Sequence, residues 1–214
     1  MKEELNMELE EEAITLRGKT LKILRPKRLE DIFQGDPFLE TEKFPFWFKI
    51  WEGSLILADY LATLSEKKKI LELGCGLGVV SLFASAFGHE VLATDIEELP
   101  LKILQKSAEL NNLSFKIQKL DILNPELKET FDIIAASEIL YKKSFYDPLL
   151  KFFKDYLKPT SEVLLAHSEE RKRTLISFLV KAQNFFEIQT SVRRLKSPDE
   201  TATIILNRLI PKAS

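Results

Sequence analysis

The stretch "ILELGCGLG", residues 70–78, decides the fold that we expect for this chain. A short apolar run leads directly into a loop with glycine at positions 74, 76 and 78, and an apolar segment at helical spacing follows. Glycines let the backbone turn tightly and pass close to a ligand. The free N–H groups at the start of the following helix favour an anionic group. The stretch therefore predicts a strand, a ligand-binding loop and a helix.

Strand and helix patterns alternate along the rest of the chain. Strands are expected at residues 69–73, 90–95, 115–121, 131–138, 162–167, 186–195 and 201–210, and helices at 53–64, 78–88, 99–112, 145–157 and 169–185. The last two strands are joined by a segment too short for a crossover helix, so they form an antiparallel hairpin. Residues 13–26 read as an earlier hairpin that turns at Gly18. We therefore expect an α/β fold: a doubly wound, mostly parallel seven-stranded sheet with a C-terminal antiparallel hairpin, preceded by an N-terminal β-hairpin and a helix.

Composition narrows the class of protein. Of 214 residues 45% are hydrophobic and 30% charged, and the net charge of -2 gives no general attraction to nucleic acid or anionic membrane. The single cysteine, Cys75, excludes an internal disulfide, and the two histidines, His89 and His167, are too far apart to start a zinc cluster. The acidic N-terminus is unlike a signal peptide. We expect one cytoplasmic domain over residues 1–214, with a tail, hairpin and loop in 1–43 and a cofactor-binding core in 44–214. We expect a monomer with no metal and no nucleic-acid or membrane partner.

The spacing of the loop selects a cofactor class. Val79 stands where the dinucleotide fingerprint places its third glycine, and no Gly-Lys-Ser/Thr follows, which disfavours a nucleoside triphosphate. Asp95, at the end of the second strand, can accept both ribose hydroxyls of a nucleoside. Glu72 lies beside the ligand, where it would repel a pyrophosphate but suits an ammonium and a sulfonium. These features favour S-adenosylmethionine.

The ordered set "ILELGCGLG", "ATD", "KLDIL" and "FDIIAASEILY" resembles the seven-β-strand, class I, S-adenosylmethionine-dependent methyltransferases over about residues 45–210. The resemblance implies that Asp121 caps the adenine amino group and that Ile122 lies against the ring; the alternative is that Asp121 caps a turn before Pro125. Cys75 contributes its backbone rather than chemistry. The cofactor-binding set that we predict is Trp51, Glu72, Gly74, Cys75, Gly76, Gly78, Asp95, Asp121, Ile122 and Ser137.

The aromatic stretch "FPFWFKIWEG", residues 44–53, has two interpretations. If it is helical, Phe44, Phe48, Trp51 and Leu55 share one face and pack in the core. Together with "SEILY", however, "IWEG" resembles methyltransferase family 16, whose characterised members are mainly protein-lysine methyltransferases. That resemblance implies that Trp51 lies over the cofactor. Trp47 and Phe46 would then line the acceptor entrance or pack beneath it.

The second family mark is Glu138-Ile139-Leu140-Tyr141, after the fourth strand, where the carboxyl end of the sheet faces the crevice. We assign Glu138 to positioning the acceptor or cofactor and Tyr141 to hydrogen bonding, and we predict these two as the catalytic residues. The alternative is a carboxylate that opens a helix and a packed aromatic ring. Two departures from the family bear on the substrate: the family more often has Asp in place of Glu138, and many members have an aromatic residue in place of Ile122.

The function that we predict is N-methylation of a lysine in a protein substrate. A small-molecule amine or another non-protein acceptor remains open, and so does a cofactor-binding scaffold without activity. "SEIL" lacks the prolines that exocyclic base amines call for, and the loop spacing disfavours a dehydrogenase. The basic run 171–173 is interpreted as a solvated helix face. His167, at a strand end, faces the crevice or serves the structure.

Overall fold

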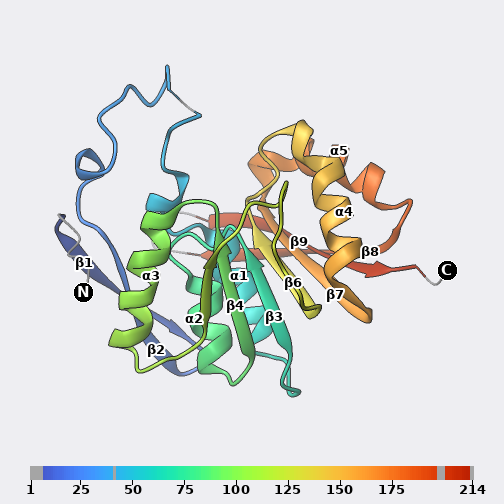
Figure 1. Ribbon diagram of the computed structural model, residues 1–214, viewed down its shortest axis with the longest axis horizontal. Helices are drawn as coiled ribbons and strands as arrows, with labels where there is room; N and C mark the ends of the chain where they lie inside the picture. The colour runs from blue at the N-terminus through green and yellow to red at the C-terminus, as the bar shows by residue number, and fades with distance from the viewer. Residues whose placement is uncertain (1–6, 41, 197–200, 213–214) are drawn as a thin grey trace.

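A seven-stranded sheet forms the centre of the molecule (Figure 1). The computed structural model describes residues 7–40, 42–196 and 201–212. In spatial order the strands are β5 (Lys116–Lys119), β4 (Glu90–Asp95), β3 (Lys69–Leu73), β6 (Phe131–Ser137), β7 (Leu157–Ser168), β9 (Thr201–Pro211) and β8 (Phe186–Lys196). All neighbours from β5 to β7 pair in parallel, and β9 runs antiparallel to both β7 and β8. The predicted sheet and its C-terminal hairpin are confirmed, and β5 and β8 form the open edges.

Helices cover both faces of this sheet (Figure 1). The helices are α1 (Glu52–Leu61), α2 (Val79–Ala86), α3 (Glu98–Leu110), α4 (Tyr146–Tyr156) and α5 (Lys172–Ala182), and short 3-10 turns lie at Leu29–Asp31, Phe46–Phe48, Lys143–Phe145 and Glu169–Arg171. Side chains alternate along β3: Leu71 and Leu73 pack with α4 and α5, whereas Ile70 packs with α1 and α2. None of the helices in the described ranges is both long and apolar enough to cross a membrane.

The N-terminal hairpin, β1 (Leu9–Leu16) and β2 (Lys19–Pro26), lies outside the central sheet. Its two-residue turn places Arg17 and Gly18 at positive φ, as a type I′ turn requires. The free edge of β2 docks on α3: the N–H of Leu24 donates to Ser107 Oγ at 3.0 Å, and the side-chain amide of Asn111 bonds both the N–H and the C=O of Lys22. The hairpin is thus attached by these hydrogen bonds and by the buried side chains of Leu21 and Ile23, and not by pairing with the central sheet.

The hairpin begins earlier than the sequence pattern indicated. Glu10, Glu11 and Glu12 belong to β1 and not to an acidic tail, and residues 1–6 lie outside the described part of the chain. The reason is the opposite strand, which is basic: Arg25 pairs with Glu10 and Glu12, and Lys22 pairs with Glu11. Cross-strand pairs of opposite charge favour this register.

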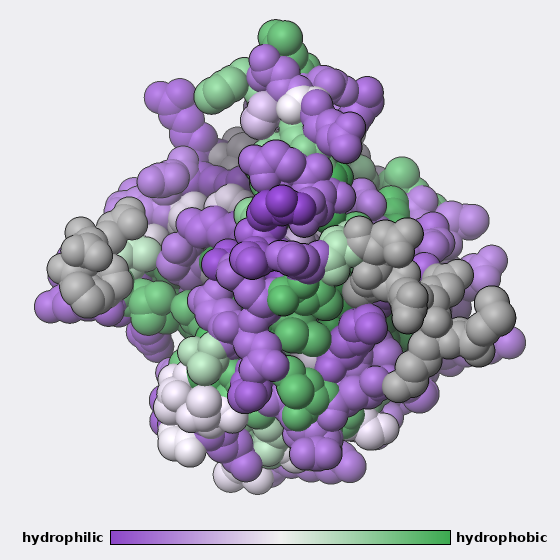
Figure 2. Space-filling model, turned by 90° about the vertical axis from the view of Figure 1, so that its left-hand side faces the viewer, coloured by the Kyte–Doolittle hydropathy of each residue, from purple (hydrophilic) through white to green (hydrophobic). Residues whose placement is uncertain are grey.

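A long loop, residues 27–51, connects β2 to α1. Its tip carries Phe38 and Leu39, which are 91% and 83% exposed. Figure 2 shows hydrophobic side chains at the top of the molecule, above a side that is mostly hydrophilic. Glu42 pairs with Lys142 at 2.8 Å. This ion pair ties the loop to the segment that follows β6.

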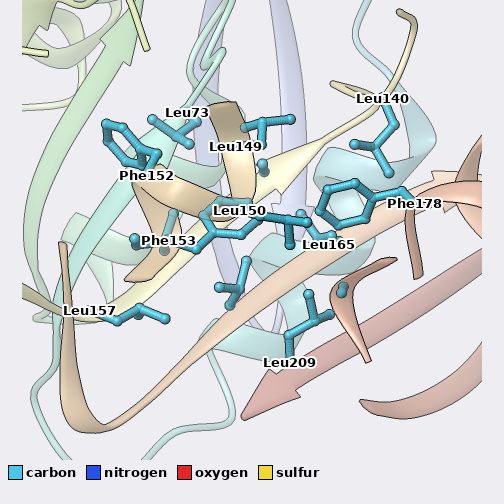
Figure 3. Packing of buried hydrophobic residues seen from close by; sticks show 14 of the residues in the cluster. Leu73, Leu140, Leu149, Leu150, Phe152, Phe153, Leu157, Leu165, Phe178 and Leu209 are labelled. Carbon is cyan, nitrogen blue, oxygen red and sulfur yellow. The ribbon is translucent and has the colours of Figure 1, made fainter. Parts of the chain in front are cut away.

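The largest part of the core lies between the sheet and the helices α4 and α5. Phe152 and Phe153 of α4 and Phe178 of α5 are almost fully buried. Figure 3 shows Phe153 and Phe178 on either side of Leu150 and Leu165, and Phe152 beside Leu73. Burying one such side chain stabilises the fold by about 1.5–3 kcal/mol. The packing fixes β7 and its neighbour β6, whose carboxyl end carries the predicted catalytic segment.

Candidate functional site

The glycine loop joins β3 to α2. Gly74, Gly76 and Gly78 all have positive φ, at 62°, 51° and 75°, a conformation that L-residues adopt with strain. Space is also limiting: a Cβ on Gly78 would lie 2.2 Å from Leu104 of α3, and one on Gly74 would lie 3.2 Å from Ile139. The glycines are therefore needed for backbone shape and for close packing, and the loop lies against the segment after β6.

Asp95, at the end of β4, supports this loop. One carboxylate oxygen accepts the N–H of Gly76 at 2.8 Å, and the other accepts the N–H of Glu97 at 3.0 Å. Burial raises the pKa of Asp95, and these backbone hydrogen bonds oppose the rise. A carboxylate offers about four acceptor positions, so both oxygens retain capacity for further donors. The N–H of Cys75 donates to the C=O of Thr94 at 2.9 Å and joins the loop to the same strand.

Glu72 is buried on the α2 side of the sheet. Its Oε2 accepts the N–H of Ser81 at 2.9 Å and also the Ser81 hydroxyl, in the first turn of α2. Burial raises the pKa of Glu72 to about 8, although the Ser81 hydrogen bonds act in the opposite direction. Sequence reasoning missed Ser81, whose signal is a polar residue within the apolar run of α2. Direct contact between Glu72 and a cofactor stays a prediction.

The chain after β5 carries Asp121 and Ile122. Asp121 is exposed, and its Oδ1 accepts the N–H of Leu123 at 2.9 Å, which is the turn-capping role considered as the alternative. Ile122 packs on the α4 side of the core. The N–H of Leu120 donates to the C=O of Asp95 at 2.9 Å, so this turn starts next to the ribose-binding candidate. Adenine recognition by Asp121 stays a prediction.

The aromatic segment is not a helix, so the condition for a shared face of Phe44, Phe48, Trp51 and Leu55 is not met. Only Phe46–Phe48 form a 3-10 turn, Lys49 and Trp51 are extended, and α1 begins at Glu52. The Trp51 indole N–H donates to the C=O of Phe46 at 2.8 Å. This bond folds the segment back on itself, which a continuous helix would not allow.

The two tryptophans consequently occupy different places. A Cβ on Gly76 would lie 3.3 Å from the Cβ of Trp47, and Trp47 packs with the buried cluster that contains Cys75. Trp51 faces the other end of the site, where the guanidinium of Arg171 lies 5.4 Å from its ring centroid and Lys49 Nζ lies 5.0 Å from it. Trp47 thus lies against the glycine loop with its backbone and Cβ, and Trp51 is the ring next to Arg171.

Gly53 lies where the start of α1 packs closely against the central sheet. A Cβ there would lie 2.6 Å from Ser137 Oγ and 3.4 Å from the C=O of Ala166. Only glycine lets the first turn of α1 approach the carboxyl ends of β6 and β7 this closely. The sequence reasoning overlooked this role. Ser137 Oγ is buried and has no hydrogen-bond partner within the described residues.

Glu138 is buried directly after β6 and has a positive φ of 57°, which is unusual for a non-glycine residue. Its Oε1 accepts the N–H of Ser168 at 2.5 Å, and its Oε2 lies 3.4 Å from Nε of Arg171. Burial raises the pKa of Glu138, while Ser168 and Arg171 oppose the rise. The carboxylate therefore connects the ends of β6 and β7.

Tyr141 is 55% exposed, and its ring centroid lies 5.6 Å from that of Phe145. Partial burial raises the pKa of its phenol; Lys142 acts against this rise, and the charges of Asp95 and Glu97 add to it. Tyr141 is therefore within electrostatic range of the predicted ribose-binding carboxylate.

Two residues near the end of β7 bear on the expectations: the burial of His167 agrees with its structural alternative, whereas Arg171 departs from the expected solvated face. His167 is fully buried, and burial followed by the charge of Arg171 lowers its pKa to about 3, so the ring is neutral near pH 7. The interpretation of 171–173 as a solvated helix face is wrong for Arg171, which precedes α5 and points inward to Glu138. Lys172 and Arg173, within α5, are exposed as expected.

The structure thus brings together the glycine loop, Asp95, the Glu138–Tyr141 segment and the aromatic segment at the carboxyl ends of β3, β4 and β6. Within the described ranges no group of three or more His, Cys, Asp or Glu residues is arranged to hold a metal ion. A family model described as lysine methyltransferase matches residues 41–185. The chain belongs to this family.

Two relatives illustrate what this lysine methyltransferase family member is similar to. The protein-lysine methyltransferase METTL21E of Mus musculus is 32% identical over 134 residues, which cover 55% of this chain and 54% of the relative. The ribosomal protein L11 methyltransferase of Thermoanaerobacter pseudethanolicus is 33% identical over 181 residues, covering 80% of this chain and 55% of the relative. The chain therefore spans about half the length of these relatives.

Solved structures agree on the fold. The ribosomal protein L11 methylase of Lactobacillus delbrueckii subsp. bulgaricus superposes with a TM-score of 0.60 at 20% identity, covering 77% of this chain and 81% of that one. S-adenosylmethionine is the cofactor that membership of the family implies. The residues present fit it, because the positive-φ glycines bring the backbone close to a ligand and Asp95 keeps acceptor positions for hydroxyl donors.

Proposed function

We propose that this protein transfers a methyl group from S-adenosylmethionine to the side-chain amine of a lysine in a protein substrate. Family membership supports the proposal. The observation that carries it is the position of Glu138 and Tyr141: they follow β6, and Ile139 between them lies against the glycine loop. Groups that serve the acceptor are thereby next to the groups that would serve the cofactor.

The cofactor half of the proposed site consists of Gly74 to Gly78 and Asp95. Asp95 would receive the ribose hydroxyls on the acceptor positions that Gly76 and Glu97 leave free. The other proposed contacts are Trp51, Glu72, Asp121, Ile122 and Ser137. S-adenosylmethionine supplies an electrophilic methyl group on a sulfonium sulfur.

The acceptor half must present a neutral amine with its lone pair aimed at the methyl carbon. A lysine is protonated at neutral pH, and partial desolvation lowers its pKa toward the range in which the free amine exists. The aromatic segment supplies apolar surface for that purpose. Glu138 orients the amine from its fixed position between Ser168 and Arg171, and Tyr141 donates or accepts a hydrogen bond at the rim. Most of the rate enhancement then comes from proximity and alignment.

The test is transfer of label to protein. The purified chain is incubated with radiolabelled S-adenosylmethionine and lysate of its own organism, and labelled bands are mapped by mass spectrometry. The proposal expects lysine residues that carry added methyl groups, and no labelled band with the Asp95→Ala variant. Label found only on small molecules or RNA would overturn the protein-lysine assignment and leave the cofactor assignment intact.

The ring over the cofactor is tested separately. The proposal assigns that place to Trp51, whereas Trp47 packs against Gly76. Fluorescence of the wild type should change when S-adenosylhomocysteine binds, and Trp51→Phe should remove most of that change. A signal lost in Trp47→Phe and kept in Trp51→Phe would transfer the role to Trp47.

A further inference from the structure

Arg171 connects two parts of the proposed site that are far apart in the sequence. Its Nε lies 3.4 Å from Oε2 of Glu138. Its guanidinium carbon also lies 5.4 Å from the ring centroid of Trp51 and 6.0 Å from that of Phe46. The Arg171 side chain is 27% exposed and that of Glu138 only 6%. One cation therefore bridges a buried carboxylate and the aromatic segment.

The chemistry of arginine suits this position. A guanidinium is planar, so it can stack on aromatic rings with its face while its edge donates to a carboxylate. The 3-10 turn Glu169–Arg171 directs the side chain inward, because Arg171 precedes α5 instead of lying on its outer face. Its C=O also accepts the hydroxyl hydrogen of Thr174 at 2.8 Å, which fixes the backbone at this point.

The charge balance around Glu138 depends on Arg171. The charged groups that act on this carboxylate are Arg171 before α5 and Glu52 of α1, and His167 of β7 is within electrostatic range of the same arginine. His167 is neutral, and Lys49 pairs with Glu52 at 3.1 Å. Arg171 is therefore the cation that offsets Glu138. An unpaired carboxylate would favour the ammonium form of an acceptor lysine, which has no lone pair to donate.

We propose that Arg171 is a positioning residue of the acceptor site, which holds the Glu138 carboxylate and the Phe46–Trp51 segment in one arrangement and offsets the negative charge beside the acceptor amine. The role at the amine rests on the proposed function. The mechanical connection between Glu138 and Trp51 does not, so the two can be tested apart.

The connection is tested by tryptophan fluorescence without substrate. Arg171→Gln should change the emission of Trp51 and its quenching by acrylamide, and the change should be absent in a Trp51→Phe background. Arg173→Gln, an exposed arginine two residues away, is the matched control and should leave both unchanged. Glu138→Gln should produce part of the Arg171→Gln change. If the tryptophan emission and acrylamide quenching of Arg171→Gln equal those of Arg173→Gln, the proposal is overturned.

The effect on the acceptor is tested by the pH dependence of transfer, measured against protein substrate. Arg171→Gln should move the rising limb of the rate profile to higher pH by about one unit, because the unpaired carboxylate raises the pKa of the acceptor amine. Arg171→Lys should return the rising limb to its wild-type pH, and so should the double variant Arg171→Gln/Glu138→Gln. A merely structural role would lower the rate at every pH without moving the limb, and that result would refute the charge-offset part. If the wild type methylates no protein, the proposed function fails, while the fluorescence experiment still decides the connection.

Discussion

The two ends of the site differ in how completely their polar groups are paired. At the glycine-loop end, Asp95 bonds the N–H of Gly76, and Glu72 bonds both the N–H and the hydroxyl of Ser81. At the carboxyl ends of β6 and β7, four buried side-chain atoms have no hydrogen bond within the described residues: Ser137 Oγ, both ring nitrogens of His167, and Glu138 Oε2, whose partner is the Arg171 ion pair at 3.4 Å.

This difference teaches where the molecule is preorganised and where it carries an energetic penalty. A buried polar atom without a hydrogen bond costs about 1–3 kcal/mol, and a left-handed backbone like that of Glu138 costs about 1–2 kcal/mol. The core under β6 and β7, with Phe153 and Phe178, offsets these penalties. We therefore interpret the glycine-loop end as a preformed cradle and the acceptor end as a strained region held by its surroundings.

The strongest way to break the preformed end is Asp95→Ala. The substitution removes the proposed ribose acceptor and the support of the Gly76 N–H, and we expect cofactor binding to weaken by about 2–4 kcal/mol. Calorimetry with S-adenosylhomocysteine measures this. Asp121→Ala, which removes an exposed carboxylate, is the comparison and should lose less. Equal losses of affinity in the two variants would show that the hydrogen-bonded carboxylate of Asp95 contributes no more to cofactor binding than the exposed carboxylate of Asp121.

At the acceptor end, Glu138→Gln keeps the shape and removes the charge. We expect transfer to slow by about ten- to a thousandfold, which corresponds to about 1.4–4 kcal/mol of barrier. Affinity for S-adenosylhomocysteine should change much less, because the glycine-loop end is untouched. Steady-state rates together with calorimetry separate the two quantities. An unchanged rate would remove Glu138 from the proposed catalytic group.

The buried carboxyl of Glu72, at the glycine-loop end, should make the free energy of unfolding depend on pH. In the folded protein the raised pKa lets this carboxyl keep a proton up to about pH 8, whereas the unfolded chain releases it near the ordinary glutamate pKa of 4.5. Between these values rising pH favours unfolding, by at most about 1.4 kcal/mol per pH unit. Denaturant unfolding at pH 5 to 8 should therefore show wild-type stability falling relative to Glu72→Gln. The exposed acid variant Glu170→Gln should keep the wild-type slope, and parallel curves for wild type and Glu72→Gln would contradict the buried, protonated carboxyl.

The smallest expected effect concerns the backbone of Glu138. Glu138→Gly and Glu138→Ala both remove the carboxylate, but only glycine relieves the left-handed conformation. We expect the glycine variant to be more stable than the alanine variant by about 1 kcal/mol, measured by denaturant unfolding. Alanine equal to or better than glycine would mean that the backbone relaxes and that the acceptor end holds no such strain.

Regular, repeated patterns in the sequence were sufficient for most of the fold. The strand–helix alternation, the loop "GCGLG" and Asp95 lie where the pattern predicts, because buried parallel strands and glycine turns have strong local signals. The boundary of the N-terminal hairpin was missed since its register depends on cross-strand pairs such as Glu10–Arg25, which no local pattern encodes.

The irregular parts of the site were the difficult ones. Trp51 sits in a non-helical segment held by one indole-to-carbonyl bond, and Arg171 is directed inward by a turn of three residues just before α5. Neither residue belongs to a periodic sequence pattern that would predict its position. Ser81 and Gly53 are single residues whose roles depend on a neighbour in space, Glu72 and Ser137. Long-range partners of this kind cannot be inferred from the spacing of one chain.

The two open edges of the central sheet bear on how this protein behaves at high concentration. An unpaired strand edge is a template on which a second chain can add a strand. Edge strand β5 carries Lys116 and Lys119, and edge strand β8 carries Arg193, Arg194 and Lys196. Joining two copies through these edges would strip water from the charged side chains. The composition of the outermost strands thus disfavours aggregation by sheet extension, while the apolar strands remain in the interior.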